Sequence, residues 1–225
     1  VKRQSGFLRP AFMGSRVLGN STYTPYFYVI AEDKDITIKP RYFRNGKYIL
    51  QNEYRQATEN SFTIVDFSYA KGHDSSKLDK GDSRSHFFMN TDLDLDLDDY
   101  IKSELVIDLQ KASNDSYLNA FGLVSPLLTG SKTVLESKIK LDLEHEDFNF
   151  NGSFKVYETL AGLNSDRYQY ILPVYSFSKS FDLEDKNIDG SFAFNHSGSN
   201  TLNSTNVLST TVSNDLNFKS FDFYT

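Results

Sequence analysis

The chain has 225 residues, and its formal net charge of −6 argues against nucleic acid as its main partner. It contains no cysteine, which excludes disulfides and thiolate metal sites, and no run of 18 apolar residues that would predict a membrane-spanning helix. Aromatic residues make up 15% of the chain and are mostly interleaved with polar ones. This interleaving indicates strands with two different faces.

Two strand-like stretches at the start of the chain each contain a proline. Pro10 lies in the stretch 5–12, and Pro25 lies in the stretch 21–31. Proline has no N–H to donate to a sheet ladder, so it is confined to edges, strand starts and bulges. We therefore expect a weakly paired seam between these strands, whereas Pro40 is expected near a strand end. The alternative is that each proline merely ends or bends its own strand.

The middle of the chain alternates most clearly, over residues 85–99. One predicted face carries Phe87, Met89, Thr91, Leu93, Leu95 and Leu97, and the other carries His86, Asn90, Asp92, Asp94, Asp96 and Asp98, with Phe88 as the exception. The same pattern recurs over 101–109 and 135–146.

The charged face of this region predicts a polar lining. Its members are Asp92, Asp94, Asp96, Asp98, Lys102 and Glu104. A calcium site is the alternative, but alternate residues on a strand lie about 7 Å apart along a line, so their carboxylates do not converge on an ion. We therefore interpret this face as the wall of a wet lumen.

Later segments are more aromatic, and the whole chain predicts roughly ten to twelve strands of about ten residues. Connections differ in kind: Arg44–Lys47 contains Asn-Gly, a strong hairpin signal, whereas 71–84, 111–132 and 196–206 are long and polar. Phe121 and Leu127-Leu128 are exceptions within the second of these. The predicted fold is all-β, an antiparallel transmembrane β-barrel of which this chain is an incomplete segment. The strands of a soluble β-sandwich also alternate between apolar and polar residues, so this fold remains an alternative prediction.

No catalytic, metal or cofactor site is predicted. The histidines are scattered without metal-ligand spacing, at His73, His86, His145 and His196. The chain also lacks the Gly-x-Ser-x-Gly elbow of serine hydrolases.

The first 55 residues contain a series whose order and spacing match a known family. The matching residues are Arg3, Ser5, Gly6, Phe7, Leu8, Pro10, Pro25, Tyr26, Phe27, Ile30, Ala31, Asp35, Thr37, Ile38, Pro40, Arg41, Tyr42, Gly46, Asn52, Glu53, Tyr54 and Arg55. Residues 113–118 add a shorter match. In these residues the chain resembles the β-barrel of the lipopolysaccharide-assembly outer-membrane family LptD, also called OstA. Beyond about residue 125 only general barrel character remains.

The resemblance implies a function and a location. In that family a large outer-membrane barrel receives lipopolysaccharide from periplasmic bridge proteins. The lipid tails leave into the membrane lipids between the first and last strands, and the sugar passes through the lumen. Prolines matching Pro10 and Pro25 weaken this lateral gate, and a lipoprotein plugs the barrel. The implied role is transport rather than catalysis.

The resemblance also implies that residues 1–225 are only part of a barrel. They correspond to roughly its first half, without the family's periplasmic N-terminal domain and its cysteines. Such a segment is not expected to function alone, because open sheet edges are not tolerated in a bilayer. Two other classes remain open from the residues: a self-contained porin-like or enzymatic outer-membrane barrel, and a soluble β-sandwich binding module.

Overall fold

The computed structural model describes residues 3–15, 18–44, 46–71, 83–128, 132–160, 167–185, 188–203, 207–218 and 222–223. Within them the chain forms one antiparallel sheet of 15 strands and a single four-residue helix, α1 (Tyr117–Ala120). None of the described helical residues form a helix long and apolar enough to cross a membrane.

The strands fall into a short and a long group. The short strands are β1 (Gly6–Phe7), β2 (Ala11–Ser15), β3 (Gly19–Tyr23), β4 (Tyr26–Val29) and, at the other end of the chain, β15 (Asp222–Phe223). The long strands are β5 (Lys34–Phe43), β6 (Tyr48–Ala57), β7 (Ser61–Lys71), β8 (Arg84–Asp94), β9 (Lys102–Ala112), β10 (Val134–Glu144), β11 (Phe148–Thr159), β12 (Tyr168–Asp185), β13 (Ile188–Leu202) and β14 (Leu208–Phe218).

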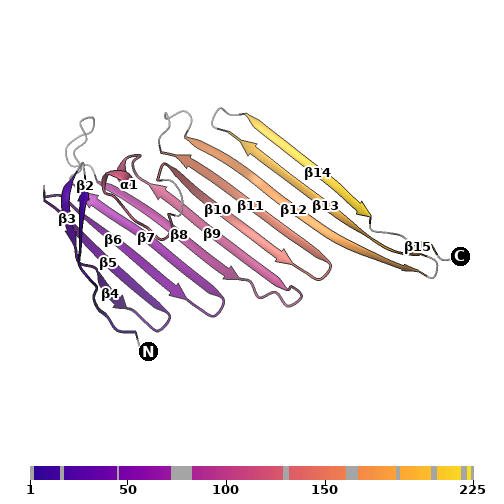
Figure 1. Cartoon of the computed structure of the whole chain (residues 1–225), viewed down its shortest axis with the longest axis horizontal. Helices are drawn as coiled ribbons and strands as arrows, with labels where there is room; N and C mark the ends of the chain where they lie inside the picture. Colours follow the sequence, from indigo (N-terminus) through magenta and orange to yellow (C-terminus); the bar gives the residue numbers. More distant parts are fainter. Residues whose placement is uncertain are drawn as a thin grey trace.

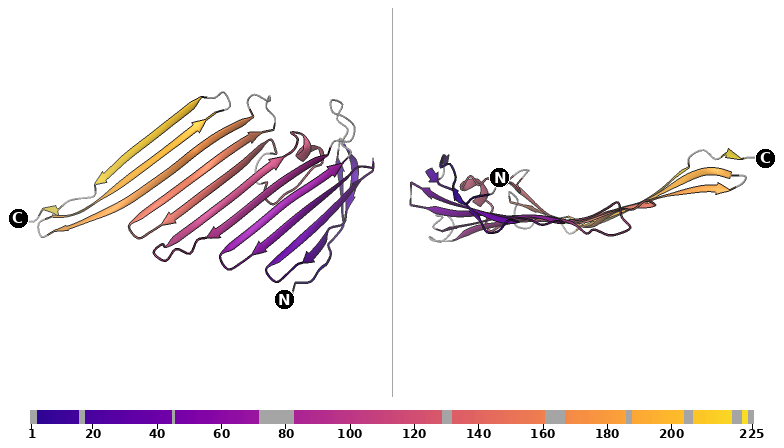
Figure 2. Two further views of the ribbon diagram at one scale, coloured as in Figure 1. Left: turned by 180° about the vertical axis from the view of Figure 1, so that it is seen from behind. Right: turned by 90° about the horizontal axis from the view of Figure 1, so that it is seen from below.

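Each long strand pairs with its neighbours in sequence, so the sheet is a simple meander (Figure 1). The first strands and β14 lie at opposite ends of it and do not pair with each other. Seen from below, both ends of the sheet curve toward the same side, and α1 lies on that concave side (Figure 2). The prediction of an all-β antiparallel fold is confirmed, and the sheet is not closed within the described residues.

The two alternating faces predicted for residues 85–99 are present on β8, but the strand is shorter than predicted. On β8, Phe87 is 44% exposed on the convex face, whereas the neighbouring Phe88 is 1% exposed on the concave face. The strand ends at Asp94, although the alternation predicts it as far as residue 98. Asp96 has a positive φ of 49°, which is incompatible with a continuing strand. Asp96 and Asp98 therefore lie in the β8–β9 connection.

Apolar packing on the concave face comes from a segment that the sequence presents as a polar loop. After β9 ends at Ala112, residues 113–128 fold back over the sheet, and we call them the 113–128 segment (Figure 1). Its side chains that are 3% exposed or less include Tyr117, Leu118, Phe121 and Leu123. They share one buried cluster with Phe43, Ile49 and Phe88 of the strands. Phe88 breaks the polar pattern of β8 because this segment covers it.

Connections differ in length between the two ends of the strands. The predicted long connection 196–206 is wrong for residues 196–202, because these residues pair with β12 and β14 as part of β13. Residues 58–60 and 145–147 make short connections at one end, whereas 72–83 and 113–133 make long ones at the other. The tight Asn-Gly turn lies at the end with the long connections. Gly46 there has a φ of +79°, a conformation that favours glycine, and the Phe43 N–H donates to the Lys47 carbonyl at 2.9 Å.

Truncating Leu118, which is fully buried, is expected to release the 113–128 segment from the sheet. Leu118→Ala leaves a cavity that costs about 2–5 kcal/mol, enough to populate a detached segment. We expect limited proteolysis to cut within 113–128 in this variant. Val124→Ala is the matched control, since Val124 lies in the same segment and is 68% exposed. Equal protection of both variants would contradict the assigned packing.

Candidate functional site at the proline seam

The first two strands of the sheet are each broken into two halves. Residues 6–15 form the first strand, as β1 and β2, and residues 19–29 form the second strand, as β3 and β4. β1 pairs with β4, and β2 pairs with β3, while both halves of the second strand pair with β5. The breaks fall at 8–10 and 24–25, so Pro10 and Pro25 lie within them at the same level. We call this region the proline seam.

Pro25 removes one bond between the first two strands. The Leu8 N–H donates to the Pro25 carbonyl at 2.8 Å. Residues opposed in this way in an antiparallel pair normally exchange two bonds. The reciprocal bond is impossible here because Pro25 has no N–H. The seam therefore holds one bond where a regular ladder would hold two.

Pro40 removes a bond on the other side of the second strand. The register of the second strand with β5 runs without a shift from Tyr23↔Arg41 to Tyr26↔Ile38, which sets Thr24 opposite Pro40. Bonds alternate along an antiparallel strand. Since the Pro25 carbonyl faces the first strand, Thr24 faces β5 and meets a proline that cannot donate. Pro40 lies inside β5 rather than at a strand end as expected.

Pro10 affects the free edge of the sheet. The register changes from Gly6↔Phe27 to Ala11↔Tyr23, so the first strand carries one extra residue across the break. Ala11 lies opposite Tyr23 and faces the second strand, which turns the nitrogen of the exposed Pro10 toward the unpaired edge. Pro25 and Pro40 therefore each remove a ladder bond beside the second strand, and Pro10 removes a donor from the free edge at the same level.

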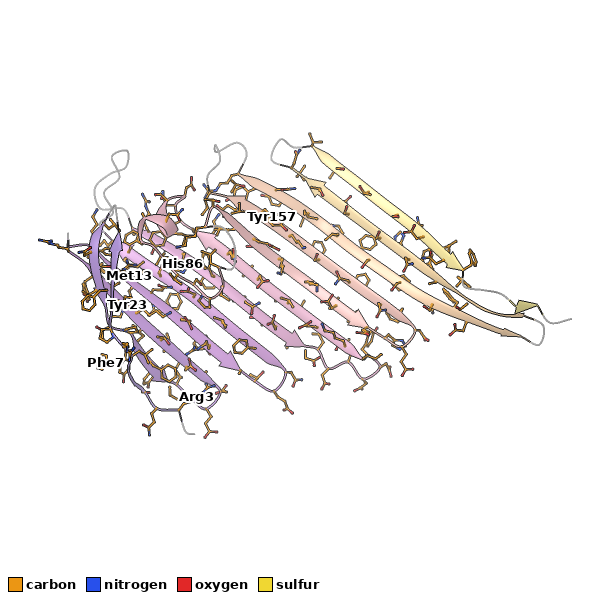
Figure 3. All side chains as sticks on the ribbon, in the orientation of Figure 1. Arg3, Phe7, Met13, Tyr23, His86 and Tyr157 are labelled. Carbon is orange, nitrogen blue, oxygen red and sulfur yellow. The ribbon has the colours of Figure 1, made fainter. Side chains whose placement is uncertain are left out.

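Below the proline level, the seam is fastened by an ionic cluster on the concave face. Asp35 accepts hydrogen bonds from Arg3 at 3.0 Å and from Arg55 at 2.8 Å, and its side chain is 5% exposed. Arg55 also contacts Glu53, which pairs with Lys39 at 2.7 Å. The cluster connects the residues before the first strand to β5 and β6. Figure 3 places Arg3 and Phe7 at this end of the sheet.

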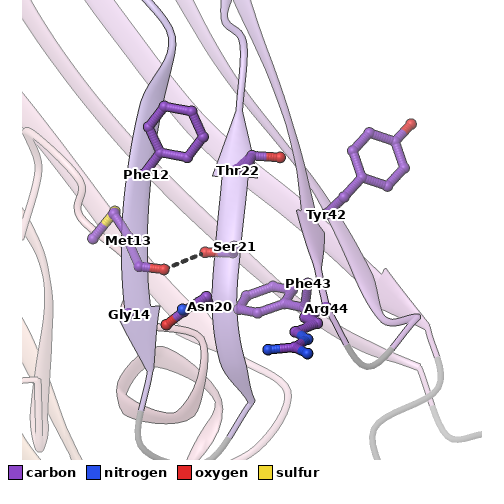
Figure 4. Close-up of a pocket in the computed structure, with 9 residues that line it drawn as sticks. All are labelled: Phe12, Met13, Gly14, Asn20, Ser21, Thr22, Tyr42, Phe43 and Arg44. Carbon is purple, nitrogen blue, oxygen red and sulfur yellow. Dashed lines mark hydrogen bonds between the residues drawn. The ribbon is translucent and has the colours of Figure 1, made fainter.

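Above the proline level, a second cluster links four elements. The buried Arg41 of β5 donates through Nε to Ser21 Oγ at 2.8 Å and through Nη1 to the Phe121 carbonyl at 2.6 Å. Ser21 Oγ in turn donates to the Met13 carbonyl at 3.0 Å (Figure 4). A hollow of about 550 Å³ opens here between the ends of β2, β3 and β5.

The other residues of the matched series lie around the same strands. Ser5 Oγ accepts a bond from the Val29 N–H at 2.9 Å, and Gly6 pairs with Phe27. Phe7 points outward, 77% exposed, with its ring 5.0 Å from that of Tyr26. Other members are Leu8 in the break, Ile30 and Ala31 in the turn before β5, Thr37 and Ile38 in β5, Asn52 in β6, and Tyr54, which donates to Gln56.

Beside the aspartates of the predicted polar lining lie several ion pairs. On the concave face Asp92 is half-buried, and Asp94 is exposed. The neighbouring ion pairs are Lys102–Glu104, Lys138–Asp108 and Lys140–Asp142. No group of three or more His, Asp or Glu among the described residues is arranged to hold a metal ion, and His73 lies outside them.

A third polar cluster, which the sequence did not reveal, connects the 113–128 segment to β7 and β8. His86 lies 2.5 Å from Ser68 Oγ through Nδ1 and 3.3 Å from Asp66 through Nε2, and Ser68 Oγ lies 2.7 Å from the Tyr117 hydroxyl. These residue types also form hydrolase triads, but all four are 3% exposed or less. Burial raises the pKa of the Tyr117 hydroxyl, so it stays protonated. The cluster is structural.

Replacing Pro25 should add the missing bond. We expect Pro25→Ala to place an N–H opposite the Leu8 carbonyl, which strengthens the pair by about 1 kcal/mol. Hydrogen exchange of this variant should show a protected amide at residue 25. Pro10→Ala is the control, because its new N–H faces away from the second strand and should gain no bond from it. An unprotected amide at residue 25 would contradict the assignment that the backbone of residue 25 faces Leu8.

Removing the charge of Asp35 should free the start of the first strand. Asp35→Asn weakens charge-assisted bonds to Arg3 and Arg55, which we expect to cost about 1.5–3 kcal/mol locally. Amides of residues 3–8 should then exchange faster. Asp33→Asn is the matched control, since Asp33 lies two residues away in the turn before β5 and accepts only a 3.4 Å bond from Gln56 among the side-chain bonds of the described residues. Identical exchange in both variants would exclude this anchor.

Comparison with known proteins supports a family assignment. No protein-family model matches the chain. It is 28% identical over 168 residues to LPS-assembly protein LptD of Nitrosococcus oceani, which covers 71% of the chain and 20% of that relative. It is 36% identical over 86 residues to LPS-assembly protein LptD of Pseudomonas aeruginosa, covering 38% of the chain and 8% of that relative. The corresponding protein of Idiomarina loihiensis is 27% identical over 72% of the chain and 20% of its own length. The chain thus spans a fifth or less of these relatives, and over the matched residues it is similar to LPS-assembly proteins named LptD.

Proposed function

We propose that the chain forms the N-terminal part of an outer-membrane β-barrel that transports lipopolysaccharide and inserts it into the outer leaflet through a lateral gate. The observation that carries the proposal is the alignment of Pro10, Pro25 and Pro40 at one level beside a free sheet edge. The relatives are, by name, LPS-assembly proteins. In this role the chain makes and breaks no covalent bond.

The convex face has the character of a surface in contact with lipid. Its exposed aromatic side chains include Phe12 at 81%, Tyr42 at 63% and Phe154 at 52%. Soluble monomers rarely expose large contiguous apolar patches. A tilted strand needs about 9–11 residues to cross a bilayer, and β5 to β11 have 10 to 12. We therefore propose that these strands span the outer membrane.

The concave face has the character of a polar path. Charged groups, paired with partners on the same strand or a neighbouring one, extend from Lys39 and Glu53 on β5 and β6 to Lys140 and Asp142 on β10. Asp142 is also bonded to Asn151 of β11. Such a surface keeps water and hydroxyl groups solvated, which suits the sugar part of lipopolysaccharide. Asp92, Asp94, Lys102 and Glu104 belong to this path in our proposal, with Asp96 and Asp98 at its end.

The open edges of the sheet support the proposal that further strands complete the barrel. A bilayer does not tolerate unpaired backbone groups in its apolar region. The first strand and β14 each present such an edge within the described residues. The relatives are about five times longer than the matched region or more. We propose that residues 1–225 form roughly the first half of a closed barrel.

The seam gives a physical basis for lateral release. Each absent ladder bond lowers the cost of separating strands by about 1 kcal/mol in water and by more in lipid. The prolines concentrate these losses at the height of one break, whereas the clusters of Asp35 and Arg41 hold the strands below and above it. Lipid tails would leave between the first strand and the strand that closes the barrel, beside Pro10. A plug lipoprotein and periplasmic bridge proteins are the partners proposed for the complete protein.

Two other functions fit the structure less well. A self-contained porin-like or enzymatic barrel needs its first and last strands to pair, and the described strands do not. A soluble β-sandwich needs a second sheet packed on the first, whereas the described strands form a single sheet. The apolar convex face would then be left in water.

The proposal predicts that restoring donors at the seam impairs export. In the complete protein, Pro10→Ala combined with Pro25→Ala should tighten the seam and reduce lipopolysaccharide at the cell surface several-fold, measured by surface labelling in a strain depleted of the native protein. Thr24→Ala is the control, because it lies beside Pro25 and leaves every backbone donor unchanged. Normal surface lipopolysaccharide in a stably inserted double variant would reject the gate.

A further inference from the structure

We propose that the 113–128 segment is a latch on the first two strands, and that Arg41 is the positioning residue that transmits its state to the seam. The inference rests on the proposed function for its biological meaning, since a latch matters only if the seam opens. Its structural content is independent of what passes through the seam. It follows from the contacts of Arg41 together with the packing of the segment.

The 113–128 segment packs tightly against the neighbouring strands. Leu118 and Phe121 are fully buried, and the Phe121 ring meets the Phe43 ring edge-on at 5.6 Å. The Val124 carbonyl accepts a bond from Gln51 of β6 at 3.0 Å, and Gln51 also donates to Asp66 of β7. The segment is therefore anchored to β5, β6 and β7, outside the proline seam.

Leu18, between β2 and β3, joins the buried apolar cluster, whereas nearer the prolines the contact is polar and passes through Arg41. A cavity of about 220 Å³ lies between the 113–128 segment and the first strands, lined by Met13, Pro25, Arg41, Gly122 and Val124 among others. Because this cavity separates the two sides, the link at the level of Pro25 is the chain of bonds from the Phe121 carbonyl through Arg41 and Ser21 to Met13.

One guanidinium thus bridges three separate pieces of structure. It holds the 113–128 segment through Nη1 and the second strand through Nε, and it lies 4.7 Å from the centre of the Phe43 ring. The second strand then holds the first through Ser21. If the segment leaves its seat, Arg41 loses one fixed acceptor, and its hold on Ser21 loosens. Coupling of this kind is reciprocal, so opening the seam must also loosen the segment.

Substitution of Gly122 offers a second way to perturb the hydrogen bond between the Phe121 carbonyl and Arg41. It follows Phe121 directly and has a φ of +57°, and nothing lies within 4 Å of where a Cβ would stand. Gly122→Ala therefore meets no clash but strains the backbone that aims the Phe121 carbonyl at Arg41. Gly122→Ala perturbs this hydrogen bond from the 113–128 segment, whereas Arg41→Met removes its donor on β5.

The test is hydrogen exchange on the complete protein in detergent, following amides of residues 11–23 and 113–128. We expect Arg41→Met and Gly122→Ala each to accelerate exchange of residues 11–23 at least five-fold. Arg41→Met should also accelerate exchange of residues 113–128. Lys39→Met is the matched control, because Lys39 lies two residues away on the same face and pairs with Glu53 outside this link. It should leave residues 11–23 unchanged.

Each outcome decides the proposal. Unchanged exchange of 11–23 in a folded Arg41→Met protein overturns it, and so does acceleration of equal size in Lys39→Met. If Arg41→Met does not insert, Gly122→Ala decides between the two outcomes by the same criterion. Normal export in the Pro10 and Pro25 double variant, with accelerated exchange in Arg41→Met, would reject the proposed function while keeping the latch.

Discussion

The hydrogen-bond ladder between neighbouring strands is the interaction on which this structure depends. The described residues form a single curved sheet without a second layer over most of its area, so most strands are held by their neighbours and not by a core. In such an architecture the absence of a ladder bond has no packing to compensate it. The prolines of the first three strands therefore weaken the sheet more than they would in a two-layered protein.

Apolar packing is concentrated beside this weak region. The 113–128 segment places Tyr117, Leu118 and Phe121 against the concave face of the N-terminal strands, and Ser68 forms a hydrogen bond with the buried Tyr117 hydroxyl. The consequence is a rigid platform at β5 to β8 next to two broken strands. In the proposed function, this arrangement would confine the lateral opening to the edge strands.

The broken strands are controlled from both ends. The Asp35 cluster closes the end near the short turns, and the Arg41 cluster closes the end under the 113–128 segment. Both clusters use arginine, which offers several donors from one planar group and so connects more than two partners at once. The strands between them can separate locally while their ends stay in register, as long as the two clusters hold.

Alternation along the chain was sufficient to predict an all-β antiparallel sheet with one apolar and one charged face, because side chains of a strand point to opposite sides at every step. The prolines could likewise be recognised as ladder defects from their chemistry. What the sequence left undecided was which defects coincide, since the alignment of Pro10, Pro25 and Pro40 depends on the register between strands.

Only the tertiary structure showed that the long connection after β9 packs over the sheet. Two exceptions to the pattern, Phe88 on a polar face and Phe121 in a polar loop, were visible in the sequence but could not be joined without the fold. The role of Arg41 was hidden for the same reason, because its partners at residues 21 and 121 are far apart in the chain. The local pattern thus determined what each strand is made of, and only the register and the folded loop determined where the sheet is weak and what holds it.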